Sequence, residues 1–278
     1  PSRAQALVSS YRFWFWARIP HSRSGAMPCP WGGDAASGEV PRLVVLLSGG
    51  GTTLQNIMDR IDAGKLRAQV ALVIASKEDA FGVQRAIKKG VPTKVVPSAR
   101  FRKDKKTDWT AFSQEVARVV LEAKPDLVLL AGFMCFFELP PALEGKVMNI
   151  HPALIPAFAG HGMYGEKVHQ AVVTRGAKVS GCTVHFVTNE YDAGPIVVQH
   201  VCKVTSEDTA DDVARKVFEC ECEAYPEAIK LFLDGRLTLK DGLVHVAPDP
   251  APAVSPALLA AAGLAALAVA LGLARLRK

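Results

Sequence analysis

An amide and an imidazole lie two residues apart at Asn149 and His151, at the end of the apolar run 147–150. If this run is a strand, both side chains point to the same face, because alternate residues of a strand share a face. An asparagine amide can donate to a developing oxyanion while a histidine moves a proton. The pair fits acyl transfer, and a hydrogen-bonded strand end is the alternative.

A glycine-rich loop, Ser-Gly-Gly-Gly-Thr-Thr at 48–53, joins a predicted strand to a predicted helix. Glycines let the backbone approach a ligand, and free N–H groups at a helix start attract anions, so the loop suits a phosphate. Thr52 or Thr53 is expected to cap the helix. The loop matches neither the dinucleotide-binding pattern nor the nucleoside-triphosphate P-loop. A turn that binds nothing is the alternative.

An acidic turn, Asn-Glu-Tyr-Asp-Ala-Gly-Pro at 189–195, connects two further predicted strands. Asp and Gly beside Pro are ordinary turn residues, so the turn alone indicates only structure. A carboxylate brought close to His151 would nevertheless favour the charged imidazole.

The fold class follows from alternating patterns along the chain. Apolar runs predict buried strands at 43–47, 70–75, 93–96, 127–130 and 147–150. Helical periodicity predicts helices at 54–63, 81–89, 109–123 and 166–175. This alternation predicts an α/β fold with a doubly wound, mostly parallel sheet, which binds ligands at the carboxyl ends of its strands.

The second half of the domain is less regular. Strands are predicted at 182–187 and 195–204, close enough to pair, and a helix at 211–234 that Pro226 should break or kink. A terminal hairpin is predicted around Asp241-Gly242. The charged run 103–106 is expected to be a solvated loop. Together these elements predict a single catalytic domain over 42–248.

Composition excludes several classes of protein. The 278 residues are 49% hydrophobic and 22% charged, which is ordinary for a globular protein. The net charge of +6 divides into +3 for residues 1–42, +2 for residues 249–278 and only +1 for the body. A nearly neutral body argues against a nucleic-acid partner. The six cysteines form no C-x-x-C pair, so we expect neither a metal site nor a disulfide framework.

Both ends differ from the body. Residues 1–41 contain four arginines and no acid before Asp34, which is typical of a plastid or mitochondrial transit peptide, with a disordered extension as the alternative. Residues 249–256 are a proline-rich spacer, and residues 257–274 are apolar throughout. As a helix this stretch would span about 27 Å, which predicts a C-terminal transmembrane anchor. The alternative is an alanine-rich helix that stays in water or packs on a partner.

The chain resembles phosphoribosylglycinamide formyltransferase over about residues 42–246. The resemblance rests on five motifs in order: the glycine loop, Leu-Ala-Gly-Phe-Met at 130–134, Asn-Ile-His-Pro at 149–152, Thr-Val-His-Phe-Val at 183–187 and Tyr-Asp-Ala-Gly-Pro at 191–195. It implies formyl transfer from 10-formyltetrahydrofolate to the amine of glycinamide ribonucleotide in purine synthesis. The folate would be a cosubstrate, with no tightly bound cofactor.

The resemblance also implies roles for individual residues. Asn149 would hold the oxyanion, His151 would be the general acid/base, and Asp192 would favour the charged imidazole. The implied ribonucleotide-binding residues are Gly51, Thr52, Thr53 and Glu221, and the implied folate-binding residues are Met134, Cys135, Phe136, Phe137 and Asn149.

Thr53, Cys135 and Cys222 depart from the family pattern, which has Asn, Arg and His at these positions. We expect altered substrate binding with the chemistry retained.

Two other functions are alternatives. Formyltetrahydrofolate deformylase shares the Asn, His and Asp trio but carries an extra domain, and a non-catalytic, membrane-tethered nucleotide-binding module is the rival from another class. Methionyl-tRNA formyltransferase would need a basic extension. His185 is predicted to be a core or supporting histidine, and His169 belongs to no motif.

Overall fold

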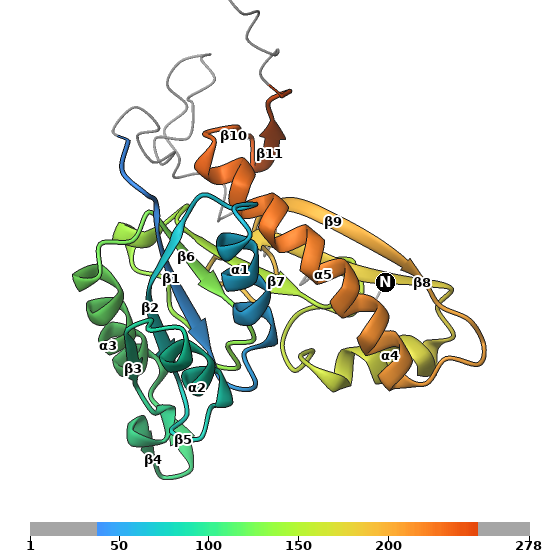
Figure 1. Cartoon of the computed structure of the whole chain (residues 1–278). Coiled ribbons are helices and arrows are strands. Elements are labelled where there is room, and N and C mark those ends of the chain that lie inside the picture. The colour runs from blue at the N-terminus through green and yellow to red at the C-terminus, as the bar shows by residue number, and fades with distance from the viewer. Residues whose placement is uncertain (1–37, 250–278) are drawn as a thin grey trace, which may run out of the picture. The chain divides into compact units, whose positions relative to one another are not determined.

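The computed structural model describes residues 38–249 (Figure 1). The predicted transit peptide, proline-rich spacer and transmembrane helix lie outside these residues, apart from 38–41 and Asp249. The chain divides into two units, Pro1–His245 and Val246–Lys278, and the main sheet, the helices and the cavity described below belong to the first. No helix within residues 38–249 is both long and apolar enough to cross a membrane.

A seven-stranded sheet organises the first unit, with the strand order β3-β2-β1-β6-β7-β8-β9 (Figure 1). Neighbours from β3 to β7 run parallel, whereas β7, β8 and β9 pair antiparallel. This confirms the predicted doubly wound, mostly parallel sheet. The strands are β1 (Arg42–Leu47), β2 (Gln69–Ala75), β3 (Thr93–Val95), β6 (Leu127–Leu130), β7 (Val147–His151), β8 (Val179–Phe186) and β9 (Ile196–Lys203).

Helices cover both faces of this sheet. Leu43, Val45 and Leu47 of β1 belong to one core with α1, α2, α4 and α5, whereas Val44 and Leu46 belong to a second core with α3. Burial on both faces explains why β1 is continuously apolar. The helices are α1 (Thr52–Asp62), α2 (Phe81–Lys88), α3 (Trp109–Glu122), α4 (Glu166–Arg175) and α5 (Ala210–Leu233), with short 3₁₀ turns η1 (Ser98–Phe101) and η2 (Pro141–Leu143).

Pro226 does not break helix α5, which runs through it without interruption. Of the two predicted effects, a break or a kink, the break does not occur, and the local bonding explains why. A proline lacks the N–H that would bond the carbonyl four residues earlier, here that of Cys222. That carbonyl instead accepts from Asn56 Nδ2 at 3.0 Å and from an Arg60 guanidinium nitrogen at 3.1 Å. The acceptor that Pro226 frees thus joins α1 to α5.

Two small hairpins complete the part of the chain that the structure describes. The predicted terminal hairpin is confirmed as β10 (Leu237–Lys240) and β11 (Leu243–Val246), with positive φ at Asp241 and Gly242. The charged run 103–106 is not simply a loop as predicted. It forms the antiparallel pair β4 (Arg102–Lys103) and β5 (Lys106–Thr107), because Asp104 and Lys105 both adopt positive φ and turn the chain back.

Candidate active site

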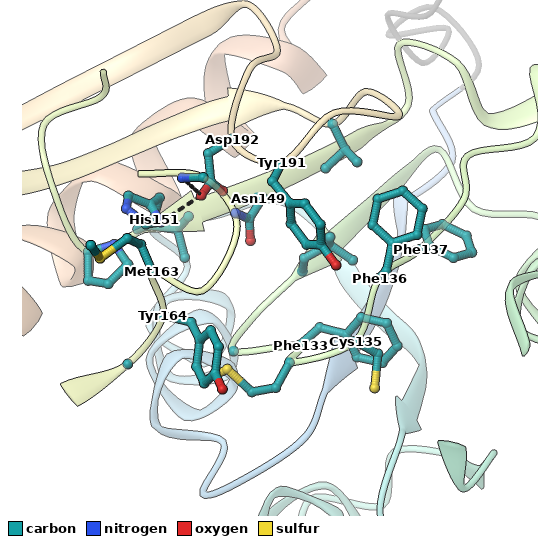
Figure 2. A pocket seen from close by; sticks show the side chains of 18 of the residues that line it. Phe133, Cys135, Phe136, Phe137, Asn149, His151, Met163, Tyr164, Tyr191 and Asp192 are labelled. Carbon is teal, nitrogen blue, oxygen red and sulfur yellow. Dashed lines mark hydrogen bonds and ion pairs between the residues drawn. The ribbon is translucent and has the colours of Figure 1, made fainter. Parts of the chain in front are cut away.

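A cavity of about 710 Å³ opens where β1, β6 and β7 end (Figure 2). The glycine loop, the segment after β6, the segment after β7 and the turn before β9 all contribute to its wall. Of the predicted site residues, the structure brings all except Gly51 to this wall. They are Thr52, Thr53, Met134, Cys135, Phe136, Phe137, Asn149, His151, Asp192 and Glu221. The carboxyl edge of the sheet is therefore where the predicted residues meet, as the fold class requires.

Asn149 and His185 lie directly opposite each other on the antiparallel strands β7 and β8. Asn149 Nδ2 is 3.2 Å from His185 Nε2, and His185 Nδ1 is 2.9 Å from the Phe186 carbonyl oxygen. Burial lowers the pKa of His185, so its ring is neutral near pH 7. A neutral ring satisfies both contacts when Nδ1–H donates to Phe186 and Nε2 accepts from Asn149. The second N–H of the Asn149 amide is then free to serve the cavity.

Asp192 lies close to the imidazoles of His151 and His185, and Figure 2 shows it beside His151. Its Oδ2 is 3.5 Å from His151 Nδ1 and accepts the Gly160 N–H at 2.9 Å, while its Oδ1 is 3.7 Å from His185 Nε2. His151 Nε2 is 2.8 Å from the Phe158 carbonyl oxygen. Acceptors therefore face both nitrogens of His151, an arrangement that suits the charged imidazole, which has two donors. The side chains of His151 and Asp192 are only 4% and 12% exposed.

The turn that carries Asp192 is fixed against β8 by close packing. Asp192 itself adopts a positive φ of 53°, in the left-handed region that asparagine and aspartate tolerate best after glycine. A Cβ added at Gly194 would lie 1.8 Å from the Phe186 carbonyl oxygen, so only glycine allows this approach. Tyr191 contacts Phe136, with ring centroids 5.0 Å apart. The turn thus delivers a carboxylate to the histidines and an aromatic ring to the cavity wall.

The glycine loop leaves the start of α1 open to a ligand. Gly51 is the N-cap residue with a φ of 71°, and a Cβ there would lie 2.6 Å from the Gly82 Cα. No side chain caps α1, so the prediction that Thr52 or Thr53 would do so was wrong: both are already helical. Their backbone N–H groups have no backbone acceptor within residues 38–249. These free N–H groups, together with the positive end of the helix dipole, favour the binding of an anion at the start of α1.

The four predicted folate-binding side chains differ in their access to the cavity. Met134 is half exposed, and Cys135 and Phe136 are partly buried, whereas Phe137 packs into the core beneath α3. The Met134 N–H donates to Ser48 Oγ at 2.8 Å, which ties this segment to the glycine loop. Figure 2 shows the Cys135 sulfur pointing away from His151. Phe137 therefore supports the wall, and the other three form its surface.

Glu221 of α5 brings an unpartnered carboxyl to the cavity. Its burial raises its pKa to about 7, and no charged neighbour contributes to that shift. Among residues 38–249, the Glu221 side chain takes part in no hydrogen bond and no ion pair. A half-ionised, unpaired carboxyl suits a ligand that carries an amine.

His169 is a cavity residue that the sequence analysis did not assign. It lies on α4, is 8% exposed and lines the same cavity as His151. Its Nδ1 is buried without a hydrogen-bond partner. The only signal in the sequence was its place beside Val168 on the buried side of a predicted helix, close to the Asn149 motif.

Residues 38–249 contain no group of three or more His, Cys, Asp or Glu side chains placed to hold a metal ion.

A model of the family described as formyl transferase matches residues 41–229. The chain belongs to the formyl transferase family. The chloroplastic phosphoribosylglycinamide formyltransferase of Arabidopsis thaliana is 37% identical over 212 residues, which are 75% of this chain and 71% of that protein. The phosphoribosylglycinamide formyltransferase of Escherichia coli is 35% identical over 72% of this chain and 90% of its own length.

Solved formyl transferase structures resemble the fold as well. The glycinamide ribonucleotide transformylase 1 of Symbiobacterium toebii is similar with a TM-score of 0.68 and 38% identity, over 76% of this chain and 96% of that one. A formyltetrahydrofolate deformylase of Pseudomonas syringae has a TM-score of 0.66 and 27% identity, over 76% of this chain and 67% of its own. The sequence motifs described above thus lie on a fold that this chain shares with both solved structures.

Proposed function

We propose that this chain transfers a formyl group from 10-formyltetrahydrofolate to the primary amine of glycinamide ribonucleotide. The observation that carries the proposal is that Asn149, held by His185, and His151, beside Asp192, lie in one cavity. The cavity thus contains an oriented hydrogen-bond donor for an oxyanion, Asn149, and a histidine, His151, with an acceptor beside each ring nitrogen. The relatives named phosphoribosylglycinamide formyltransferase support the substrate assignment.

The chemistry follows from charge development during transfer. The neutral amine attacks the formyl carbon, which forms a tetrahedral intermediate with a negative oxygen and a positive nitrogen. The free N–H of Asn149 donates to that oxygen, and His151 moves the proton from the amine to N10 of the folate. The bond between the formyl carbon and N10 then breaks. In this proposal Asp192 stabilises the charged imidazole, and His185 holds the Asn149 amide in place.

The two substrates would approach from different parts of the wall. The phosphate of the ribonucleotide binds the N–H groups of Thr52 and Thr53 at the start of α1, beside Gly51. Its amine lies near Glu221, whose unpaired carboxyl faces the cavity. The pterin of the folate contacts the segment 134–137 and the aromatic ring of Tyr191. The reacting carbon is then held between Asn149 and His151.

Product analysis separates this function from its alternatives. The purified chain is incubated with 10-formyltetrahydrofolate, with and without glycinamide ribonucleotide. We expect formylglycinamide ribonucleotide and tetrahydrofolate to form together, and little formate in the absence of the amine. Formate release that does not depend on the amine would instead indicate a deformylase, the function named for the Pseudomonas syringae neighbour. No turnover of either kind would indicate the non-catalytic nucleotide-binding module.

We infer that residues 1–41 direct the chain to an organelle. The arginine-rich, acid-poor composition supports this, as do the relatives from Arabidopsis thaliana and Vigna unguiculata, both named chloroplastic. A fluorescent protein fused to residues 1–41 should enter plastids or mitochondria of a plant cell. Diffuse cytosolic fluorescence would contradict the inference.

The apolar segment 257–274 is proposed separately as a membrane anchor, from its composition alone. A second fluorescent fusion, to residues 249–278, tests it by alkaline-carbonate extraction of cell membranes. The anchor predicts fluorescence in the membrane pellet, and recovery in the supernatant would refute it.

A further inference from the structure

Three imidazoles line the buried part of the cavity, and they differ in their bonding. His151 has an acceptor near each ring nitrogen, and His185 bonds Phe186 and Asn149. His169 makes no hydrogen bond within residues 38–249, although it is 8% exposed. The other two rings are held by the protein itself, whereas His169 is not.

The two nitrogens of His169 have different surroundings. Nδ1 is fully enclosed and has no partner, while Nε2 is not enclosed, and the residue lines the cavity. A buried N–H without an acceptor is rarer, and costs more free energy, than a buried unprotonated nitrogen without a donor. The proton of the neutral ring therefore belongs on Nε2. Burial, with a smaller effect of His151, lowers the pKa of His169 and keeps the ring neutral. His169 therefore presents one N–H donor to the cavity.

The position of α4 indicates which substrate this donor meets. Helix α4 packs against α5, the helix that brings Glu221 to the cavity. The proposed pterin-binding residues come instead from the segment after β6 and from the turn before β9. His169 and Glu221 thus belong to one packed pair of helices, and Glu221 is the residue proposed to meet the amine of the ribonucleotide.

We propose that His169 is a further substrate-binding residue, whose Nε2–H donates to the amide carbonyl oxygen of the glycinamide group. The proposal rests on the proposed function, because that carbonyl is the acceptor next to the reacting amine. A buried polar group without a partner destabilises the free protein, and it is retained where a ligand completes its hydrogen bonds. The hydrogen bond would fix the amine relative to His151 and reject ribonucleotides without the carbonyl.

The test compares variants that remove or keep the donor. His169→Phe and His169→Leu both remove the donor, with replacement side chains of different shape, and His169→Gln keeps an N–H donor. We expect the KM for glycinamide ribonucleotide to rise about tenfold in the first two, since one buried acceptor loses its partner. The KM for 10-formyltetrahydrofolate should stay within about twofold, and His169→Gln should recover part of the loss.

Ser180 provides the matched control. Its Oγ is the other buried polar atom without a partner among the described residues, but Ser180 does not line the cavity. Ser180→Ala should leave both KM values unchanged. Neither His169→Phe nor His169→Leu should unfold at a lower temperature than the wild type without ligand, because each removes an unsatisfied group.

The outcomes separate this proposal from the proposed function. Wild-type turnover of glycinamide ribonucleotide tests the function, and the KM values of the His169 variants test the residue. An unchanged ribonucleotide KM in His169→Phe and His169→Leu would overturn the role of His169, as would equal increases for both substrates. If both variants unfold early, His169 is a structural residue, and the proposal is wrong. If the wild type is inactive with the ribonucleotide, the proposed function fails first.

Discussion

The Asn149 amide is oriented by His185, whose Nε2 lies 3.2 Å away on the opposite strand. The ring can accept this hydrogen bond only because it is neutral: burial lowers its pKa, and the bond to the Phe186 carbonyl places its one proton on Nδ1. An amide that rotated freely would present an oxygen as often as an N–H to the reacting carbonyl. The cross-strand pair thus converts a strand end into a defined donor.

His185 is predicted to affect turnover without contacting either substrate. His185→Leu removes the acceptor that orients Asn149, and we expect kcat to fall about tenfold or more, because small misplacements of a catalytic group are costly. His185→Gln retains an acceptor and should recover part of that loss. Steady-state kinetics of both variants provide the measurement. Equal kcat values for His185→Leu and the wild type would show that Asn149 needs no such support.

Asp192 is predicted to be a catalytic side chain held in a structural turn. Asp192→Asn keeps an oxygen that can accept the Gly160 N–H but removes the charge beside His151. We therefore expect kcat to fall about 100-fold, with unfolding free energy within about 1 kcal/mol of the wild type. Kinetics and denaturant unfolding of the same preparation check both values. A large loss of stability with normal turnover would make Asp192 a turn residue only.

Glu221 makes a specific contribution to the pH dependence of stability. Burial raises its pKa from 4.5 to about 7, so the folded state holds this proton more tightly than the unfolded state. The cost of ionising Glu221 is absent below about pH 4.5, grows between about pH 4.5 and 7, and is complete above. Relative to the wild type, Glu221→Gln should gain stability over that window, by about 2–3 kcal/mol at pH 8.

Urea unfolding of Glu221→Gln and the wild type at pH 5, 6.5 and 8 measures this difference. Glu219→Gln is the control, because Glu219 is an exposed carboxyl on the same helix. The Glu219 variant should show no such trend. A stability difference between Glu221→Gln and the wild type that is the same at every pH would contradict the buried, ionisable role.

The carbonyl of Cys222 predicts an energetic coupling between α1 and α5. Asn56→Ala should cost about 1–2 kcal/mol of unfolding free energy in the wild type, because it removes a bond to a partly buried acceptor. In a Pro226→Ala background the new N–H can bond that carbonyl, so the same change should cost less. A double-mutant cycle should give a coupling of about 0.5–1 kcal/mol. Gln55→Ala should show none, because the Gln55 side chain bonds Asp59 and Arg85 and not α5.

Local patterns were enough to predict most of the fold. The apolar run 43–47 has a buried side chain at every position, and such a run has few structural alternatives to a central strand. The hairpin at Asp241-Gly242 was equally local, since two residues with positive φ define it. The same reasoning allowed a helix break at Pro226 that does not occur, because the partners that satisfy the Cys222 carbonyl lie 166 and 162 residues away in the chain. Helix breaking is a local rule, and these bonds are tertiary.

The candidate active site could also be predicted only in part from the sequence. Asn149 and His151 follow from the spacing of two residues in a strand, and Asp192 and Glu221 came from the resemblance to a family. The sequence carries no comparable signal for the contact of His185 with Asn149, which depends on the register of β7 and β8. His169 was missed because its lack of a partner is a property of packing. Such features appear only when the neighbours of each side chain are known.

The rate of glycinamide ribonucleotide formylation by Asn149→Ala is the most direct test of the proposed chemistry. The variant loses the one side chain that the site offers as an oriented donor to the oxyanion, while His151, Asp192 and the cavity wall remain. Removing one such donor lowers kcat about 100-fold or more, so we predict a decrease of at least that size with folding intact. A correctly folded Asn149→Ala protein with the wild-type kcat would contradict the account.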